Sequence, residues 1–188
     1  FDEQRRSVEM LAAEEEYLQE LEILSNDIPK KIMKASIIRQ ATASDVMLMQ
    51  TFIFKHGKNP WNFLPEHEVK AHIADIITRK VQAYLAEANG ECVGFACFYL
   101  GLPPSCQKYE ENHADNVAYL SEIVVHRDYA GQGIGSKLIN ALKENLIAKS
   151  IARLYAERHA DNVGSAKVMA KTGFKIIDST KFTHPVKK

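Results

Sequence analysis

Neither sign of charge dominates this sequence of 188 residues, because 24 basic residues balance 24 acidic ones. Nonspecific nucleic-acid binding rests on a basic excess, so we expect no nucleic-acid partner. No apolar run approaches the ~18 residues that suggest a membrane span, so we expect no membrane contact either. These absences favour a globular domain with a core of its own.

Cysteine is scarce as well. Cys92, Cys97 and Cys106 have no metal-ligand spacing, and an odd number of cysteines fits no disulfide framework. We therefore expect no metal site and a cytoplasmic protein. Cys92 and Cys97 lie in an apolar, strand-like run and are expected to be reduced core residues.

The balanced charge hides an acidic N-terminus. Residues 1–28 hold nine acidic residues against two arginines, so the rest of the chain is basic. Apolar residues recur at a helical period over residues 3–25, and the proline at position 29 ends the pattern. We divide the chain into an acidic helical extension, residues 1–34, and a second domain, residues 35–188. The apolar stripe of the helix can pack on the domain or pair with a second copy as a homodimer.

The pattern from residue 35 onward alternates between strands and helices. Asn89-Gly90 favours a tight hairpin, because both turn positions need a positive φ. Antiparallel hairpins followed by a strand–helix–strand unit predict a mixed α/β (α+β) fold, whose twisted sheet is mostly antiparallel and flanked by helices. Strands are expected from residue 35, over 82–88, 91–100, 117–125 and 151–157, and in a last pair from Phe174 that includes 181–186. Helices are expected over 45–56 with Ser44 as N-cap, 66–80, 133–149 and 165–171.

The most informative segment is residues 120–138, where an apolar strand leads through three alternating glycines into an amphipathic helix. Gly131, Gly133 and Gly135 permit unusual backbone angles and close approach, so consecutive N–H groups can converge on one anion. The helix N-terminus adds unpaired N–H groups and the positive end of its dipole. A pyrophosphate suits this site, since each charge-assisted hydrogen bond contributes roughly 1.5–3 kcal/mol.

Three other interpretations of the turn compete. A dinucleotide-binding turn needs G-x-G-x-x-G at the start of a parallel sheet and an acid about 20 residues later. Glu157 is suggestively placed, but the glycine spacing and the upstream hairpin differ. A P-loop needs a different order from Gly135-Ser136-Lys137. A turn that only joins strand to helix remains an alternative, although three glycines cost more conformational entropy than it needs.

The same block resembles the central motif of the GNAT superfamily of N-acetyltransferases, Gln/Arg-x-x-Gly-x-Gly/Ala after a strand. Gly133 and Gly135 occupy the glycine positions. The resemblance covers residues 35–186 and implies the GNAT fold. Residues 119–138 are especially close to diamine (spermidine/spermine) acetyltransferases. Weaker matches to other family motifs follow in the right order at residues 38–45, 93–96, 162–166 and 171–174.

This resemblance implies an enzyme that moves an acetyl group from acetyl-coenzyme A to a primary amine by direct attack on the thioester, releasing coenzyme A. The acceptor is a small-molecule amine or a protein amino group, and loops 57–65 and 101–116 are expected to border its pocket. In such enzymes the pantetheine arm pairs with the fourth strand, and an N–H near Val125 polarises the thioester carbonyl. The family assigns cofactor binding to Ile123, Val124, Val125, Gly131, Gln132, Gly133, Ile134, Gly135, Ser136 and Asn162.

Catalysis needs a base, because an alkyl amine is protonated at neutral pH. Glu122 on the fourth strand is the first candidate, and His126 at its end is the second. Each can instead be a surface or ion-paired side chain. Asn162 can likewise be a helix N-cap, a cofactor contact, or both.

Two positions depart from the family pattern. Ala130 replaces the glutamine or arginine that braces the phosphate turn. Met169 stands where the family often has a tyrosine that protonates the departing thiolate, and methionine cannot donate a proton. Tyr119 or Tyr155 could substitute for it. The departures motivate an alternative function, a catalytically weak or inactive acyl-coenzyme A-binding regulatory domain.

Overall fold

The computed structural model of this chain describes residues 35–109 and 116–179. Several expectations lie outside the described residues: the acidic helix over 3–25 with its homodimer, the terminal strand near 181–186, and residues 110–115 of the second loop. Within the described ranges, no helix has both the length and the apolar character that crossing a membrane requires.

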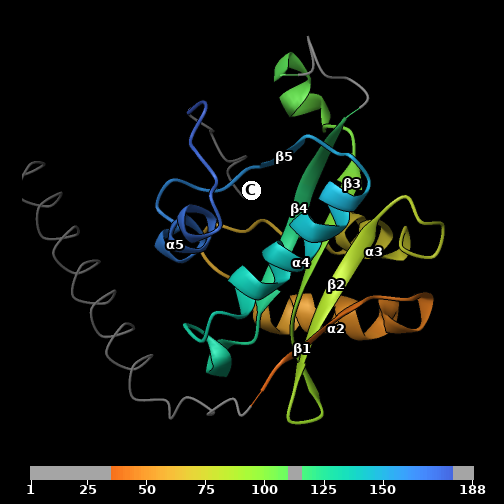
Figure 1. Cartoon of the computed structure of the whole chain (residues 1–188). Coiled ribbons are helices and arrows are strands. Elements are labelled where there is room, and N and C mark those ends of the chain that lie inside the picture. Colours follow the sequence, from red (N-terminus) through yellow and green to blue (C-terminus); the bar gives the residue numbers. More distant parts are fainter. Residues whose placement is uncertain (1–34, 110–115, 180–188) are drawn as a thin grey trace, which may run out of the picture. The chain divides into compact units, whose positions relative to one another are not determined.

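A five-stranded sheet lies at the centre of the fold, and its strands are neighbours in sequence order, β1-β2-β3-β4-β5 (Figure 1). All neighbouring strands are antiparallel except β4 and β5, which are parallel. The strands are β1 (Ile37–Gln40), β2 (Gln82–Ala88), β3 (Glu91–Leu100), β4 (Val117–Val125) and β5 (Arg153–Ala156). The predicted mixed, mostly antiparallel sheet is therefore confirmed. So is the hairpin at Asn89 and Gly90, which both have positive φ.

Helices cover both faces of this sheet (Figure 1). They are α2 (Val46–His56), α3 (Glu66–Ala74), α4 (Ile134–Ala148) and α5 (Val163–Lys171), with short 3-10 helices at Ala43–Asp45, Pro104–Tyr109 and Arg127–Tyr129. One buried cluster joins α4 and Met169 of α5 to Leu120 of β4. A second cluster joins Ile53 of α2 and Ile73 of α3 to Val124 of β4. Ile123 and Val125 of β4 pack against the first cluster and Val124 belongs to the second, so successive side chains at this end of β4 face different helices.

The predicted end of α3 and the predicted N-cap of α2 are wrong. The helix expected over 66–80 ends at Ala74, because the N–H groups of Ile76, Ile77 and Arg79 donate to carbonyls three residues earlier instead of four. Ser44 is not an N-cap. The N–H and hydroxyl of Thr42 both donate to the Asp45 carboxylate, at 2.8 and 2.9 Å, and a 3-10 turn leads into α2.

The strand expected from Phe174 is also absent from the described residues 174–179. Gly173 has a φ of 86° and reverses the chain after α5. The N–H of Phe174 then donates to the carbonyl of Met169 at 3.0 Å, and Phe174 packs against the α4 cluster. A helix cap thus uses the apolar residue that the sequence pattern assigned to a strand.

The cysteines are unpaired, as expected. Cys97 and Cys106 are buried and Cys92 is partly buried. Burial raises the pKa of each thiol, so all three stay protonated at neutral pH.

A partly buried ion pair joins the start of the sheet to the start of α2. The Arg39 guanidinium donates to both oxygens of Asp45, at 2.9 and 2.7 Å. We expect Asp45→Asn to lower the free energy of unfolding by about 1–2 kcal/mol in urea at neutral pH, because the partly exposed Arg39 loses one carboxylate partner and keeps the other, Glu87. Arg39 holds the pKa of Asp45 well below its ordinary value of 3.8. This stabilisation is therefore complete above that pH and is lost as the pH falls below it. Glu66→Gln, at an exposed pair, should change stability little.

Candidate active site

β4 and β5 pair over only part of their length. Their register begins at Val117 opposite Arg153 and ends at Leu120 opposite Ala156. β4 continues to Val125, so residues 121–125 have β3 on one side and, within the described part of the chain, no strand on the other. Such an edge presents unpaired backbone N–H and C=O groups.

A β-bulge determines which side chains of β4 face α2 and α3. The register with β3 shifts at Ser121, which is the extra residue. Ser121 Oγ donates to the carbonyl of Cys97 at 3.2 Å and lies 2.8 Å from Nε2 of His72 on α3. Side chains alternate along a strand, so Glu122 shares a face with Val124. That is the face covered by α2 and α3.

Glu122 has a raised pKa in this position. Burial raises the pKa of its carboxyl to about 7, and no ion pair or hydrogen bond to it exists among the described residues. A group that is about half deprotonated at neutral pH can both accept and release a proton there, which is the property of an acid–base catalyst.

The turn before α4 presents backbone N–H groups beside this strand. Gly131 and Gly133 both have a φ of 79°, and Gly133 is the N-cap of α4. The helix therefore begins at Ile134, one residue later than predicted. Its first hydrogen bond runs from the Lys137 N–H to the Gly133 carbonyl. The preceding N–H groups have no partner within the helix and point out of its end.

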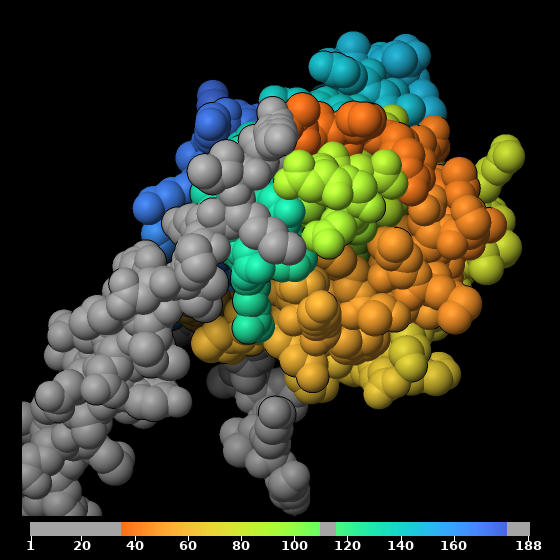
Figure 2. All heavy atoms as spheres, turned by 90° about the horizontal axis from the view of Figure 1, so that it is seen from below, coloured from red at the N-terminus to blue at the C-terminus, as the bar shows by residue number. Residues whose placement is uncertain are grey.

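The neighbouring hairpin supports that turn. Figure 2 shows the β2–β3 turn (yellow-green) next to the turn that precedes α4 (turquoise). Nδ2 of Asn89 donates to the hydroxyl of Tyr129 at 3.5 Å, and the N–H of His126 donates to the carbonyl of Val93 at 2.9 Å. Tyr129 is buried in the α4 cluster. The residues just before the glycine turn are therefore held in place by the hairpin and the core.

One cavity of about 620 Å³ collects most of the predicted site residues. Its wall includes Gly57, Asn59 and Asn62 of the first predicted loop, but no described residue of the loop 101–116. Two predicted site residues, Gln132 and His126, do not line it. Those that do are Glu122, Ile123, Val124, Val125, Gly131, Gly133, Ile134, Gly135, Ser136 and Asn162.

Asn162 has the capping role that the sequence left open. Its Oδ1 accepts a hydrogen bond from the Ser165 N–H at 3.0 Å. α5 therefore starts at Val163, two residues before the predicted start. A cofactor contact by the same side chain stays a prediction.

His126 packs behind the cavity wall. Its Nδ1 accepts a hydrogen bond from the Asp128 N–H at 3.2 Å, and its ring centroid lies 3.9 Å from that of His56. His56, at the end of α2, does line the cavity. Burial, and then the nearby His126, lower the pKa of His56 to about 4, so its ring is neutral at neutral pH. Sequence reasoning missed His56, because one histidine at a helix end carries no pattern.

Charged residues after β5 also line the cavity without having been predicted as site residues. Arg158, Lys167 and Lys171 bring positive charge to it. Glu157 accepts hydrogen bonds from the hydroxyl of Tyr119 at 2.8 Å and from Ser105 at 3.3 Å. The sequence predicted only that the chain after the acidic N-terminus is basic, and it did not single out these three cationic side chains.

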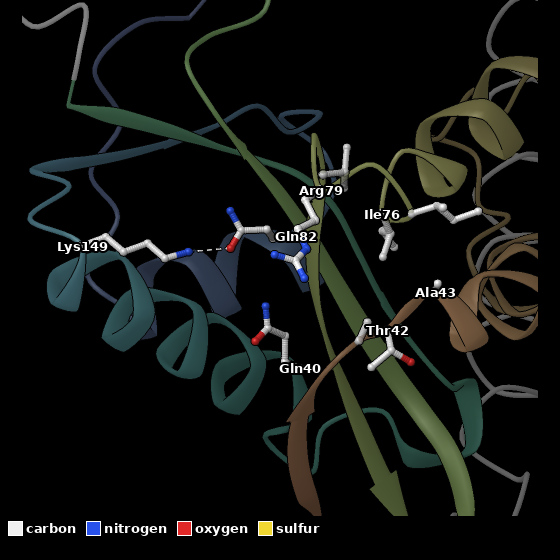
Figure 3. Close-up of a pocket in the computed structure, with 10 residues that line it drawn as sticks. Gln40, Thr42, Ala43, Ile76, Arg79, Gln82 and Lys149 are labelled. Atoms are coloured by element: carbon white, nitrogen blue, oxygen red, sulfur yellow. Dashed lines mark hydrogen bonds between the residues drawn. The ribbon is translucent and has the colours of Figure 1, made fainter.

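A second cavity, of about 650 Å³, lies between β1, β2 and the ends of α3 and α4 (Figure 3). Arg79, Gln40 and Thr42 line it, and Lys149 donates to Oε1 of Gln82 at 2.6 Å. It shares no residue with the first cavity and contains no carboxylate. It therefore lacks a candidate base, and we assign the candidate active site to the first cavity. Within the described ranges, no group of three or more His, Cys, Asp or Glu residues could hold a metal ion.

Comparison with known proteins decides the family. Residues 47–174, which hold both the cavity's strand and its glycine turn, match the Acetyltransferase (GNAT) family. This chain belongs to the GNAT family. The dinucleotide-binding and P-loop interpretations of the turn are therefore wrong.

Curated relatives of this GNAT chain are distant. The aminoglycoside N(6')-acetyltransferase type 1 of Klebsiella pneumoniae is 27% identical over 95 residues, 50% of this chain and 47% of that protein. A probable spermine N(1)-acetyltransferase of Bacillus subtilis subsp. natto is 28% identical over 87 residues, 46% of this chain and 54% of that protein. The chain thus spans about half the length of these relatives.

Solved structures share the fold of this GNAT chain. An aminoglycoside N-acetyltransferase in complex with coenzyme A matches 81% of this chain and 95% of its own, with a TM-score of 0.63 and 19% identity. A ribosomal-protein-alanine N-acetyltransferase from Brucella melitensis matches 80% and 99%, with a TM-score of 0.59 and 19% identity. At this identity the likeness establishes the GNAT fold.

The two departures from the GNAT pattern are both at the cavity. Ala130 and Met169 line it, and Met169 is buried as a core methionine would be. Neither Tyr119 nor Tyr155 lines it, and the hydroxyl of Tyr119 donates to Glu157. Neither tyrosine therefore takes the place of the missing acid in this geometry.

Proposed function

We propose that this GNAT protein is an N-acetyltransferase that transfers the acetyl group of acetyl-coenzyme A to a primary amine. One observation carries the proposal: a strand edge without a partner strand among the described residues, a glycine turn at a helix N-terminus and a carboxyl group with a pKa near 7 meet in a single cavity. The strand edge at 121–125 can pair with the amide groups of a pantetheine arm. The N–H groups of residues 131–136 can bind a diphosphate.

The cavity residues fit this cofactor. A Cβ at Gly131 or Gly133 would enter space with no other atom within 4 Å, so the turn leaves room for a ligand against its backbone. Arg158, Lys167 and Lys171 line the same cavity and supply charge that favours phosphate groups. Ala130 removes one brace of the turn but none of its backbone donors.

Glu122 is the proposed base. When bound, acetyl-coenzyme A supplies an activated acetyl thioester that a neutral amine attacks directly. An alkyl amine is protonated at neutral pH, so Glu122 is positioned to take its proton, directly or through water. The N–H near Val125 is proposed to bind the carbonyl oxygen. His126 is the second candidate, and it would have to act through water or the His56 ring, since it does not line the cavity.

The acceptor is proposed to enter between β4 and the loop after α2, past Gly57, Asn59 and Asn62. The names of two relatives, an aminoglycoside and a spermine acetyltransferase, support a small-molecule amine over a protein amino group. Three unpaired, protonated thiols suit a reducing compartment, which supports a cytoplasmic location.

Met169 favours a second candidate function, an acyl-coenzyme A-binding domain with little or no catalysis. It places a thioether in the cavity wall where the family often has a proton donor. A thiolate leaves readily enough that water can replace that donor, so we favour the enzyme.

A steady-state thiol-release assay with acetyl-coenzyme A and a panel of amines tests the proposal. We expect turnover with at least one amine and saturable acetyl-coenzyme A binding by calorimetry. Stoichiometric binding without turnover across the panel would favour the second candidate. Failure of folded protein to bind any coenzyme A species would reject both.

A further inference from the structure

Two carboxylates line the cavity, and the proposed function uses only one of them. Glu122 on β4 is the proposed base, and Glu157 directly follows the last residue of β5. Neither takes part in an ion pair among the described residues. A carboxylate that borders a ligand cavity without a basic partner in the protein is suited to bind a cationic group of a ligand.

Two hydroxyl groups hold Glu157 in place. The hydroxyl of Tyr119 donates to Oε2 at 2.8 Å, and Ser105 donates to the same oxygen at 3.3 Å. Burial, and then the adjacent Glu157, raise the pKa of Tyr119 well above its ordinary value of 10.0, so Tyr119 remains a donor at neutral pH. Its ring lies 5.5 Å from that of Tyr99. Glu157 is thus oriented before a ligand binds, which lowers the entropy cost of binding.

Glu157 and Glu122 are on the same face of the sheet. Tyr119, which contacts Glu157, pairs with Tyr99 in the β-sheet register, and the Tyr99 ring lies 6.1 Å from that of His72 on α3. The bulge in β4 directs Glu122 to the α3 side as well. Tyr119 and Glu122 lie opposite Tyr99 and Cys97, which are two residues apart on β3, so the bulge leaves them about 7 Å apart along the strand at the usual rise per residue. A short chain with an amino group at each end can span such a separation.

The cations of the cavity do not neutralise Glu157. Arg158 is its neighbour in sequence, but Nη1 of Arg158 donates to the carbonyls of His159 and Ala160, at 3.0 and 2.9 Å. The two lysines that line the cavity are on α5, on the side proposed for the phosphates. A second ammonium group of an acceptor is therefore repelled from that side and attracted to Glu157.

We propose that the acceptor is an amine with at least two protonated nitrogens, and that Glu157 binds the nitrogen that is not acetylated. This inference rests on the proposed function, because it takes Glu122 to mark the reacting nitrogen. Linear polyamines and aminoglycosides share the required chemistry, so both belong in the test.

Calorimetric titration of diaminoalkanes, and of monoamines of matching chain length, tests this without requiring turnover. With coenzyme A present, we expect the wild type to bind the best diamine about 5- to 20-fold more tightly than its monoamine, since Glu157 is exposed and a charge-assisted bond there is partly screened. In Glu157→Gln that ratio should fall to about one. Tyr119→Phe, which removes the hydroxyl that orients Glu157, should lower it partly.

Glu68→Gln is the matched control, because it removes one negative charge from an exposed position of α3. It should keep the wild-type ratio. Equal affinity for diamines and monoamines in the wild type, or an unchanged ratio in Glu157→Gln, overturns the inference. Spermine and an aminoglycoside are titrated in parallel. The compound whose affinity falls in Glu157→Gln identifies the class of acceptor, and the inference is overturned if neither affinity falls. Diamine preference without turnover in the thiol-release assay would reject the proposed function and leave the Glu157 assignment standing.

Discussion

Valine in place of Gly133 will weaken acetyl-coenzyme A binding at least about 100-fold, because it removes two or more charge-assisted hydrogen bonds of roughly 1.5–3 kcal/mol each. The side chain would occupy the space beside the turn where the diphosphate is proposed to bind. Gly133 lines the cavity as the N-cap of α4, and its backbone is not otherwise crowded.

Gly101 provides a control with similar backbone strain. Gly101 has a φ of 94° and Gly133 a φ of 79°, and neither has an atom within 4 Å of an added Cβ. Only Gly133 lines the cavity. Gly101→Val and Gly133→Val should therefore lose similar stability, about 1–2 kcal/mol from the left-handed backbone. Gly101→Val alone should bind acetyl-coenzyme A with wild-type affinity. Calorimetry below the melting temperature of both variants measures this, and similar affinities in the two would place the diphosphate elsewhere.

Gly135→Val should also prevent binding, but it is a less specific test. A Cβ at Gly135 would meet Cγ1 of Val168 at 3.3 Å and Cδ1 of Ile123 at 3.7 Å. A larger side chain would move α5 relative to β4, so lost affinity could come from a displaced wall. Gly133→Val has no such contact, so a loss of affinity in that variant is attributed to the turn itself and not to a shift of α5.

The central strands were predictable residue by residue, and the helix ends were not. The bounds of β2, β3 and β4 match the predicted ranges, because an apolar run bounded by turn residues such as Asn89-Gly90 is a local signal. The helix over 66–80 was too long, because the apolar residues Ile76 and Ile77 continue its period while their N–H groups change to shorter hydrogen bonds. The hydrophobic pattern predicts which side chains are buried, but it does not predict which carbonyl accepts each backbone N–H, so it does not fix the end of a helix.

Some residues of the candidate site were also predictable from the sequence, and others were not. Glu122 and the glycine turn lie within one continuous segment, so their neighbourhood could be inferred from sequence. The contact between Glu157 and Tyr119 joins residues 38 positions apart, and it depends on where β5 leaves β4. His56 reaches the cavity only because α2 packs across the end of β4. Such contacts follow from tertiary packing, for which a single sequence has no short-range signal.

Replacement of Glu122 by glutamine will lower kcat/KM for amine acetylation by about 10²–10⁴-fold, the usual contribution of a positioned base. The wild-type kcat/KM should rise with pH through about 7, where the Glu122 carboxyl loses its proton. Glu122→Gln should lack that rise and retain its affinity for coenzyme A. A rise near the same pH in the variant would instead assign the base to another group, with His126 the next to test.

The same substitution will stabilise the folded protein at alkaline pH. The pKa of Glu122 is about 7 in the fold against an ordinary value of 4.5, because burial disfavours its charge. The native state therefore holds this proton more tightly than the unfolded chain, and stability from the group is complete below pH 4.5 and lost as the pH rises to about 7. Glutamine has no charge to bury, so its gain in the free energy of unfolding should be larger near pH 8 than near pH 5 by about 1–3 kcal/mol. Urea unfolding at both pH values measures the gain, and Glu68→Gln should show none that depends on pH. An equal gain at the two pH values would mean that Glu122 titrates normally, which would remove its qualification as the base.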